Sequence, residues 1–92
     1  MLKKLYVMSA PSYGVKERVK VGVSENPEKR LRSLRSTHDH LLEIVAVYDV
    51  EQPFQAEAKI KREFSAFCIK GTEFFSANAS DITAFVENEV LA

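Results

Sequence analysis

The sequence is poor in the residues that form disulfides and zinc sites. It contains one cysteine, Cys68, and two histidines, His38 and His40. A single cysteine excludes an intrachain disulfide and is typical of the reducing cytoplasm. This set of side chains is also too small for a structural zinc site. We therefore expect a cytoplasmic protein whose fold depends on its own hydrophobic core.

Long apolar runs are also missing. No stretch approaches the roughly 18–20 apolar residues that a membrane helix requires, so we expect no membrane partner. The opening MLKKLYVMSAPSYG has two lysines but no extended apolar region after them, which argues against a secretory signal. With 92 residues, of which 46% are hydrophobic, the sequence predicts one globular domain over residues 1–92.

The net charge is zero, but the charges are unevenly distributed along the chain. Residues 1–35 contain nine basic and three acidic residues, a balance of +6, whereas residues 36–92 contain four basic and ten acidic residues, a balance of −6. Such a separation can give a neutral molecule one electropositive face, which would suit a phosphate-bearing partner. Mixed surfaces also separate charge by chance, so the pattern alone leaves both interpretations open.

The first half of the chain predicts two strands and a helix. KLYVMSA at residues 4–10 is typical of a short strand, and RVKVGVS at residues 18–24 has the alternation of a half-buried strand. We expect these strands to pair as an antiparallel hairpin. Asn26 is a good cap for a helix that begins at Pro27 and continues to about Thr37.

The second half predicts further elements of both kinds. LLEIVAVYDV at residues 41–50 is rich in β-branched residues and predicts a central strand. The remaining expected elements are a helix from Pro53 to about Phe67, a short extended segment TEFFS at residues 72–76, and a final helix over residues 78–92 capped by Asn78 or Ser80. The order ββαβαβα predicts an α+β fold with a small central antiparallel sheet flanked by helices.

The first predicted helix places a basic residue beside its apolar stripe. At about 100° per residue, Arg30 borders the stripe that includes Leu31 and Leu34. A half-buried arginine requires an anion, which is either a carboxylate of the protein itself or a phosphate. A structural salt bridge is the simpler of these alternatives.

The second predicted helix carries an acidic residue in the middle of its apolar face. Glu57 falls between Ile60, Phe64 and Phe54 on the helical wheel, where a lone carboxylate is costly. Lys61, one turn further on, is one candidate partner. A metal ion, or an arginine from another element, is the other.

Five short features occur in order over residues 4–76. They are LYV at 5–7, KVG at 20–22, an eight-residue step from Gly22 to Arg30, Glu57 within AEAKIKREF, and GTEFF at 71–75. This arrangement resembles the GIY-YIG nuclease superfamily, in particular its compact phage-type branch, in which the second signature reads KIG instead of YIG. GTEFF is similar to the GTEWF-like segment of that branch.

The resemblance implies a metal-dependent endonuclease with a GIY-YIG-like fold. Such an enzyme hydrolyses phosphodiester bonds of nucleic acid, DNA in the first place, with one divalent cation, Mg²⁺ or Mn²⁺. Glu57 would bind the cation, and Arg30 would stabilise charge on the scissile phosphate. Tyr6 would orient the attacking water or help to deprotonate it. Lys20 replaces the second signature tyrosine, and phosphate contact is its simplest role.

The resemblance also assigns supporting residues. Those expected to contact the substrate are Gly22, Lys29, Arg32 and Arg35. Glu73 would be a supporting carboxylate or a partner for Arg30. We expect Tyr6, Lys20, Arg30 and Glu57 to converge on one concave face of the sheet.

Some positions depart from the family pattern. Lys4 or Leu5 replaces the first glycine of the first signature, and Lys61 stands where the branch often has a histidine, close enough to Glu57 to compete with a metal. His38 and His40 follow the first predicted helix, where such pairs are more often surface residues than ligands. The alternative function is a catalytically inactive phage or mobile-element protein that binds nucleic acid, or a host or phage protein, through the same surface.

The basic first half predicts how nucleic acid binds. No predicted helix carries a base-reading pattern, so we expect weak binding to duplex or branched DNA that falls steeply as salt is added. Fluorescence anisotropy titrations at increasing salt concentration measure this dependence. Tight binding that is indifferent to salt would point to a protein partner instead.

Overall fold

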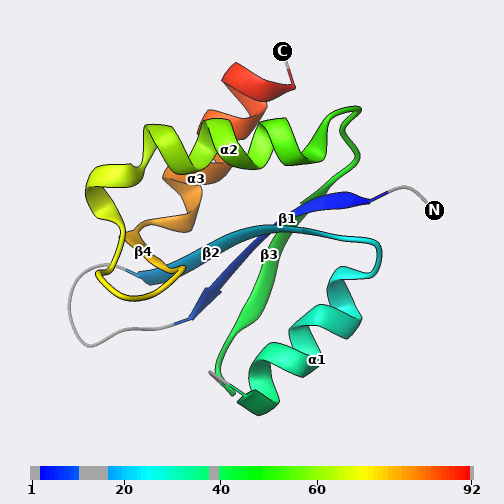
Figure 1. The fold of residues 1–92 in the computed structure, drawn as a ribbon, viewed down its shortest axis with the longest axis vertical. Coiled ribbons are helices and arrows are strands. Elements are labelled where there is room, and N and C mark those ends of the chain that lie inside the picture. Colours follow the sequence, from blue (N-terminus) through cyan, green and yellow to red (C-terminus); the bar gives the residue numbers. More distant parts are fainter. Residues whose placement is uncertain (1–2, 11–16, 38–39, 92) are drawn as a thin grey trace.

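The computed structural model describes residues 3–10, 17–37 and 40–91, which form an α+β fold with a four-stranded antiparallel sheet and three α-helices (Figure 1). The elements are β1 (Lys4–Ala10), β2 (Glu17–Ser24), α1 (Pro27–Thr37), β3 (Glu43–Tyr48), α2 (Pro53–Glu63), β4 (Phe75–Ala77) and α3 (Ala79–Phe85). The order ββαβαβα and the fold class predicted from the sequence are confirmed.

The strands lie in the order β3-β1-β2-β4, so the prediction of a central strand at residues 41–50 is wrong. β3 lies at an edge of the sheet, and its Val45 and Val47 are 45% and 42% exposed. A run of β-branched residues favours an extended conformation but does not specify how many neighbours the strand has. The centre of the sheet is instead the β1–β2 hairpin, in which every residue of β1 has a partner on β2.

The opposite edge of the sheet is only partly covered. β4 pairs with β2 at Glu17–Val19, next to the start of that strand. No described strand pairs with residues 20–24 on this side of β2. The second half of β2 is therefore a free edge, around which side chains from both faces of the sheet can meet.

The sheet separates two hydrophobic cores. On one face, β1 and β2 pack against α2 and α3 through Leu5, Val7, Val19, Val21, Ala56, Ile60, Ile82 and Val86. On the other face, β1 packs against α1 through Tyr6, Met8, Ala10, Leu31, Leu34 and Leu42. Figure 1 shows α1 alone on its side of the sheet, with α2 and α3 together on the other. Alternation along β1 therefore assigns each side chain to one of the two cores.

The helix ends differ in how well the sequence predicts them. Asn26 caps α1 as expected, because its Oδ1 accepts a hydrogen bond of 3.1 Å from the backbone N–H of Lys29. α2 ends at Glu63, four residues before the predicted Phe67, and a 3₁₀ turn follows over Ser65–Phe67. This early end leaves Cys68 exposed, away from the apolar face of the helix.

The final helix is also less regular than predicted. α3 begins at Ala79, next to the expected cap Asn78, but no side-chain hydrogen bond from Asn78 caps it. Instead, Oε1 of Glu17 on β2 accepts a hydrogen bond of 3.1 Å from the backbone N–H of Ala79. After Phe85 the chain continues as a π-helical turn over Val86–Val90.

Gly22 makes room for a tyrosine on the neighbouring strand. Tyr6 lies directly opposite Gly22 in the β1–β2 ladder and is 2% exposed. A Cβ atom on Gly22 would overlap both the ring and the hydroxyl of Tyr6. The glycine of the KVG segment is therefore required because the phenol crosses the strand at that point.

We expect the substitution Gly22→Ala to lower the free energy of unfolding by about 1–3 kcal/mol, the usual cost of forcing a buried side chain aside. Urea denaturation measures this loss. In a Tyr6→Leu background the same substitution should cost less, because leucine does not reach Gly22. An equal cost in both backgrounds would show that Tyr6 is not the obstacle.

Candidate active site

Four of the predicted site residues lie near one another beside β2. Tyr6 projects from β1 toward α1, and its hydroxyl lies within the electrostatic influence of the Arg30 guanidinium of that helix. The carboxylates of Glu57 and Glu73 lie close enough for their charges to act on the same hydroxyl. A guanidinium and two carboxylates from three different segments thus act on one phenol.

The pKa of Tyr6 rises above its ordinary value of 10.0, chiefly because the phenol is buried. The Arg30 guanidinium opposes this rise, whereas the negative charges of Glu57 and Glu73 add to it. The Tyr6 hydroxyl is therefore neutral near pH 7. In that form it can orient a water molecule or a phosphate oxygen, but it is a poor base.

Arg30 is more exposed than the sequence predicts. The buried stripe of α1 consists of Pro27, Leu31 and Leu34, and Arg30 lies outside it. Its long side chain instead reaches back to the sheet, where its partner is the Tyr6 phenol. Because this partner is neutral, it does not neutralise the charge of the guanidinium.

Glu57 reaches the site from the other side of the sheet, so the expectation that all four residues share one face is wrong. α2 and α1 pack on opposite faces, so Glu57 and Arg30 act on the Tyr6 hydroxyl from helices on different sides of the sheet. Glu57 also lies at the border of the buried stripe of α2, which is formed by Ala56 and Ile60, and its side chain is 22% exposed. The helical wheel misplaced it because Phe54 was counted as buried, whereas it is exposed.

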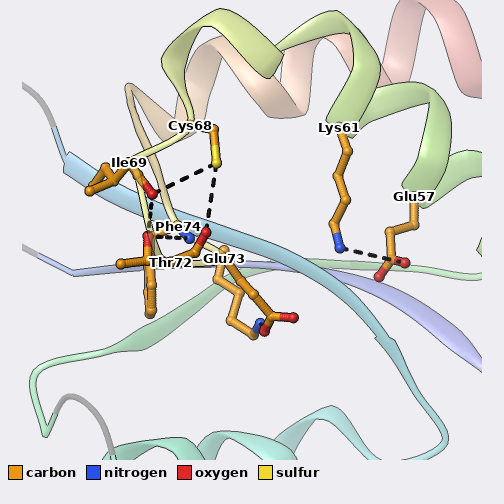
Figure 2. Close-up of polar contacts among 8 residues, drawn as sticks. Glu57, Lys61, Cys68, Ile69, Thr72, Glu73 and Phe74 are labelled. Carbon is orange, nitrogen blue, oxygen red and sulfur yellow. Dashed lines mark hydrogen bonds and ion pairs between the residues drawn. The ribbon is translucent and has the colours of Figure 1, made fainter.

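Lys61 is the ion-pair partner of Glu57. Its Nζ lies 3.7 Å from Oε1 of Glu57, and both side chains point from α2 past the sheet edge (Figure 2). This pair has the i,i+4 spacing that the sequence predicts. This distance is longer than that of an ordinary charge-assisted hydrogen bond, so the ammonium is only weakly held by the carboxylate.

Lys20 and Glu73 form a closer pair at the same edge. The Lys20 side chain is 6% exposed, and its Nζ donates a hydrogen bond of 2.7 Å to Oε2 of Glu73, whose side chain is 70% exposed. Lys20 accounts for most of the fall in the pKa of Glu73 below 4.5, and Lys61 and Arg30 contribute smaller parts. Lys20, rather than Arg30, is thus the hydrogen-bond partner of Glu73.

A compact loop holds Glu73 in place (Figure 2). Ile69 N–H donates to the Phe74 carbonyl at 2.8 Å, and the Thr72 hydroxyl donates to the Ile69 carbonyl at 2.9 Å and accepts from Phe74 N–H at 3.1 Å. Gly71 adopts a φ of 81°, which favours glycine. Gly71 and Thr72 therefore shape the loop that presents Glu73, a role that the sequence analysis did not assign to them.

Comparison with known proteins identifies the family of this chain. A family model described as the T5orf172 domain matches residues 3–90, nearly the whole chain. The chain belongs to the T5orf172 domain family. No curated protein and no solved structure matches it. None of the helices in the described part of the chain is long and apolar enough to cross a membrane.

The basic residues of α1 in this T5orf172 domain differ in their surroundings. Lys29 and Arg32 are exposed on the helix. Arg35 is also exposed, but its Nε donates a hydrogen bond of 2.7 Å to the carbonyl of Leu42, so it ties the end of α1 to the start of β3. Lys29 and Arg32 remain available for a partner, whereas Arg35 has a structural contact.

The T5orf172 domain offers a metal ion one partly exposed carboxylate. Among the residues that the structure describes, no three His, Cys, Asp or Glu side chains gather in a metal-binding cluster. His40 is exposed in a turn, and His38 lies outside the described residues. Mg²⁺ commonly keeps several waters and binds through one or two carboxylates, so Glu57 fits such a site if the Lys61 ammonium moves aside.

The pair of Glu73 and Lys20 predicts a pH-dependent contribution to stability. The folded protein holds the pKa of Glu73 below 4.5, with Lys20, Lys61 and Arg30 as the facing cations. Wild type should therefore be more stable than Glu73→Gln above pH 4.5, and the difference should vanish as the pH falls through the lowered pKa. Because Glu73 is exposed, we expect a difference of at most about 1 kcal/mol near neutral pH.

Urea denaturation of both proteins between neutral and acidic pH measures this difference. A difference that stays constant over that range would show that the ion pair does not contribute.

Proposed function

We propose that this protein is a metal-dependent endonuclease of the GIY-YIG type that hydrolyses phosphodiester bonds in nucleic acid, with DNA as the first candidate. The observation that carries the proposal is the meeting of Tyr6, Arg30 and Glu57 at the free edge of β2. Membership of the T5orf172 domain family, together with the KVG and GTEFF segments, supports the same assignment.

The cations of the site have complementary parts in this proposal. Arg30 binds the scissile phosphate and stabilises the negative charge that develops on it, because its guanidinium is exposed and its present partner is neutral. Lys20 contacts the same or the adjacent phosphate. Lys29 and Arg32 extend the basic surface along α1 toward the flanking backbone.

The remaining groups position the water and the metal. Tyr6, neutral and held by Arg30, orients the attacking water or a phosphate oxygen. Glu57 holds one Mg²⁺ or Mn²⁺ ion. A bound divalent cation supplies Lewis-acid activation of the phosphodiester and lowers the pKa of coordinated water. Gly22 serves this arrangement indirectly, since it leaves room for the Tyr6 ring.

A second function is favoured by one observation. The Lys61 ammonium lies beside Glu57, where a metal ion would otherwise sit. If Lys61 keeps that place in solution, the same basic surface serves a non-catalytic protein that binds nucleic acid, or a host or phage protein. The two functions differ in whether Glu57 takes up a divalent cation.

Substitution of Glu57 separates these functions. Glu57→Gln keeps the shape of the side chain and removes its charge, so it should abolish Mg²⁺-dependent cleavage of plasmid or branched DNA. Mn²⁺ should raise the melting temperature of wild type but not of Glu57→Gln, because only the carboxylate binds the ion. A nicking assay and a thermal melt with and without Mn²⁺ measure the two effects.

Two further variants complete the test. Glu63→Gln removes an exposed carboxylate from the same helix and should retain both cleavage and the response to Mn²⁺. Lys61→Met should respond to Mn²⁺ more strongly than wild type, since it removes the competing ammonium. If no variant responds to Mn²⁺ and wild type does not cleave, the binding function replaces the enzymatic one.

A further inference from the structure

The ion pair of Lys20 and Glu73 joins one of the least exposed charged side chains to one that is largely exposed. Lys20 lies on β2 opposite Met8, on the face that packs against α1, and only 6% of its side chain is exposed. An ammonium with so little access to water is favoured by an anion beside it, because burying an unpaired charge is costly. Glu73 supplies this anion from outside, with 70% of its side chain in solvent.

The Glu73 carboxylate can move away from Lys20 without a change in the backbone of its loop. The loop that carries it is fixed by hydrogen bonds of Ile69, Thr72 and Phe74, and none of these involves the Glu73 side chain. Rotation of the Glu73 side chain into solvent therefore breaks the contact with Lys20 without disturbing the loop. The carboxylate would lose little on leaving, because it is already mostly hydrated.

A pocket opens beside this pair. It has a volume of about 350 Å³, and its lining includes Arg18, Lys20, Thr72 and Glu73. The Arg18 guanidinium lies 6.0 Å from the centre of the Phe74 ring, at the same pocket. A guanidinium and an ammonium that share one pocket are groups that proteins use to bind phosphate.

We propose that Glu73 occupies the place of a nucleic-acid phosphate on Lys20 in the free protein, and that a backbone phosphate displaces it and enters the pocket beside Arg18 and Thr72. This inference rests on the proposed function, since it assumes that the substrate is a nucleic acid. It adds a second phosphate position to the one at Arg30 and gives Glu73 a role opposed to binding.

The exchange explains how the site can favour a polymer over a free anion. A single phosphate ion that displaces Glu73 gains Lys20 but has to break an existing ion pair of 2.7 Å. A nucleic acid makes the same exchange while its neighbouring phosphates contact Arg30 and the exposed basic side chains of α1. The carboxylate therefore lowers the affinity for both ligands, but only the polymer has further contacts to compensate.

The inference is tested by the affinity of Glu73→Gln for a fluorescein-labelled DNA duplex, measured by anisotropy in EDTA so that no cleavage occurs. We expect about two- to fivefold tighter binding than wild type, the range that release of one exposed ion pair allows. Glu51→Gln, which removes an exposed carboxylate at a different pocket, should change the affinity less. In Lys20→Met/Glu73→Gln the gain should be lost.

Inorganic phosphate supplies a second measurement on the same proteins. It should raise the melting temperature of Glu73→Gln more than that of wild type, because the vacated position on Lys20 binds an anion. Weaker or unchanged DNA binding by Glu73→Gln, or an equal gain in Glu51→Gln, would overturn the inference. A response to inorganic phosphate without a gain in DNA affinity would also overturn it, since the occupant would then not be a nucleic acid.

Failure of the proposed function has a different signature. A protein that does not cleave DNA and does not respond to Mn²⁺ refutes the nuclease, but the binding measurements in EDTA still decide whether Glu73 competes with a phosphate.

Discussion

The short pairing between β4 and β2 determines where a site can form. β4 reaches only Glu17–Val19, so the rest of β2 forms an open edge between two layers of helices. A fully paired strand there would place a backbone between α1 and α2 and separate Arg30 from Glu57. Because the edge is open, both side chains act on Tyr6, although their helices lie on opposite faces.

The same layering converts a charge difference along the chain into a difference between faces. α1 carries Lys29, Arg30, Arg32 and Arg35, all exposed, and it alone covers its face of the sheet. The opposite face carries both the acidic residues Asp81, Glu87 and Glu89 of the C-terminal segment and the basic residues Lys59, Lys61 and Arg62 of α2. A neutral protein can thus present the basic surface of α1 to a polyanion.

The sequence predicts local structure well here and spatial neighbours poorly. Local sequence patterns located β1 and β2, with period-2 alternation in β2, and Asn26-Pro27 located the start of α1, because these signals depend on adjacent residues. The edge position of β3 depends on strand order, which its own residues do not encode. Glu57 was predicted in the middle of an apolar face but lies at its border, and its position relative to α1 depends on the topology.

In the free protein, two ion pairs at this edge join groups that are proposed to bind ligands to opposite charges of the same chain. Lys20 is paired with Glu73, and Glu57 is paired with Lys61, so these two proposed ligand-binding groups already hold an opposite charge from the chain itself. An incoming phosphate would exchange with Glu73, and an incoming cation would exchange with Lys61. Each ligand would therefore compete with an existing ion pair of the chain.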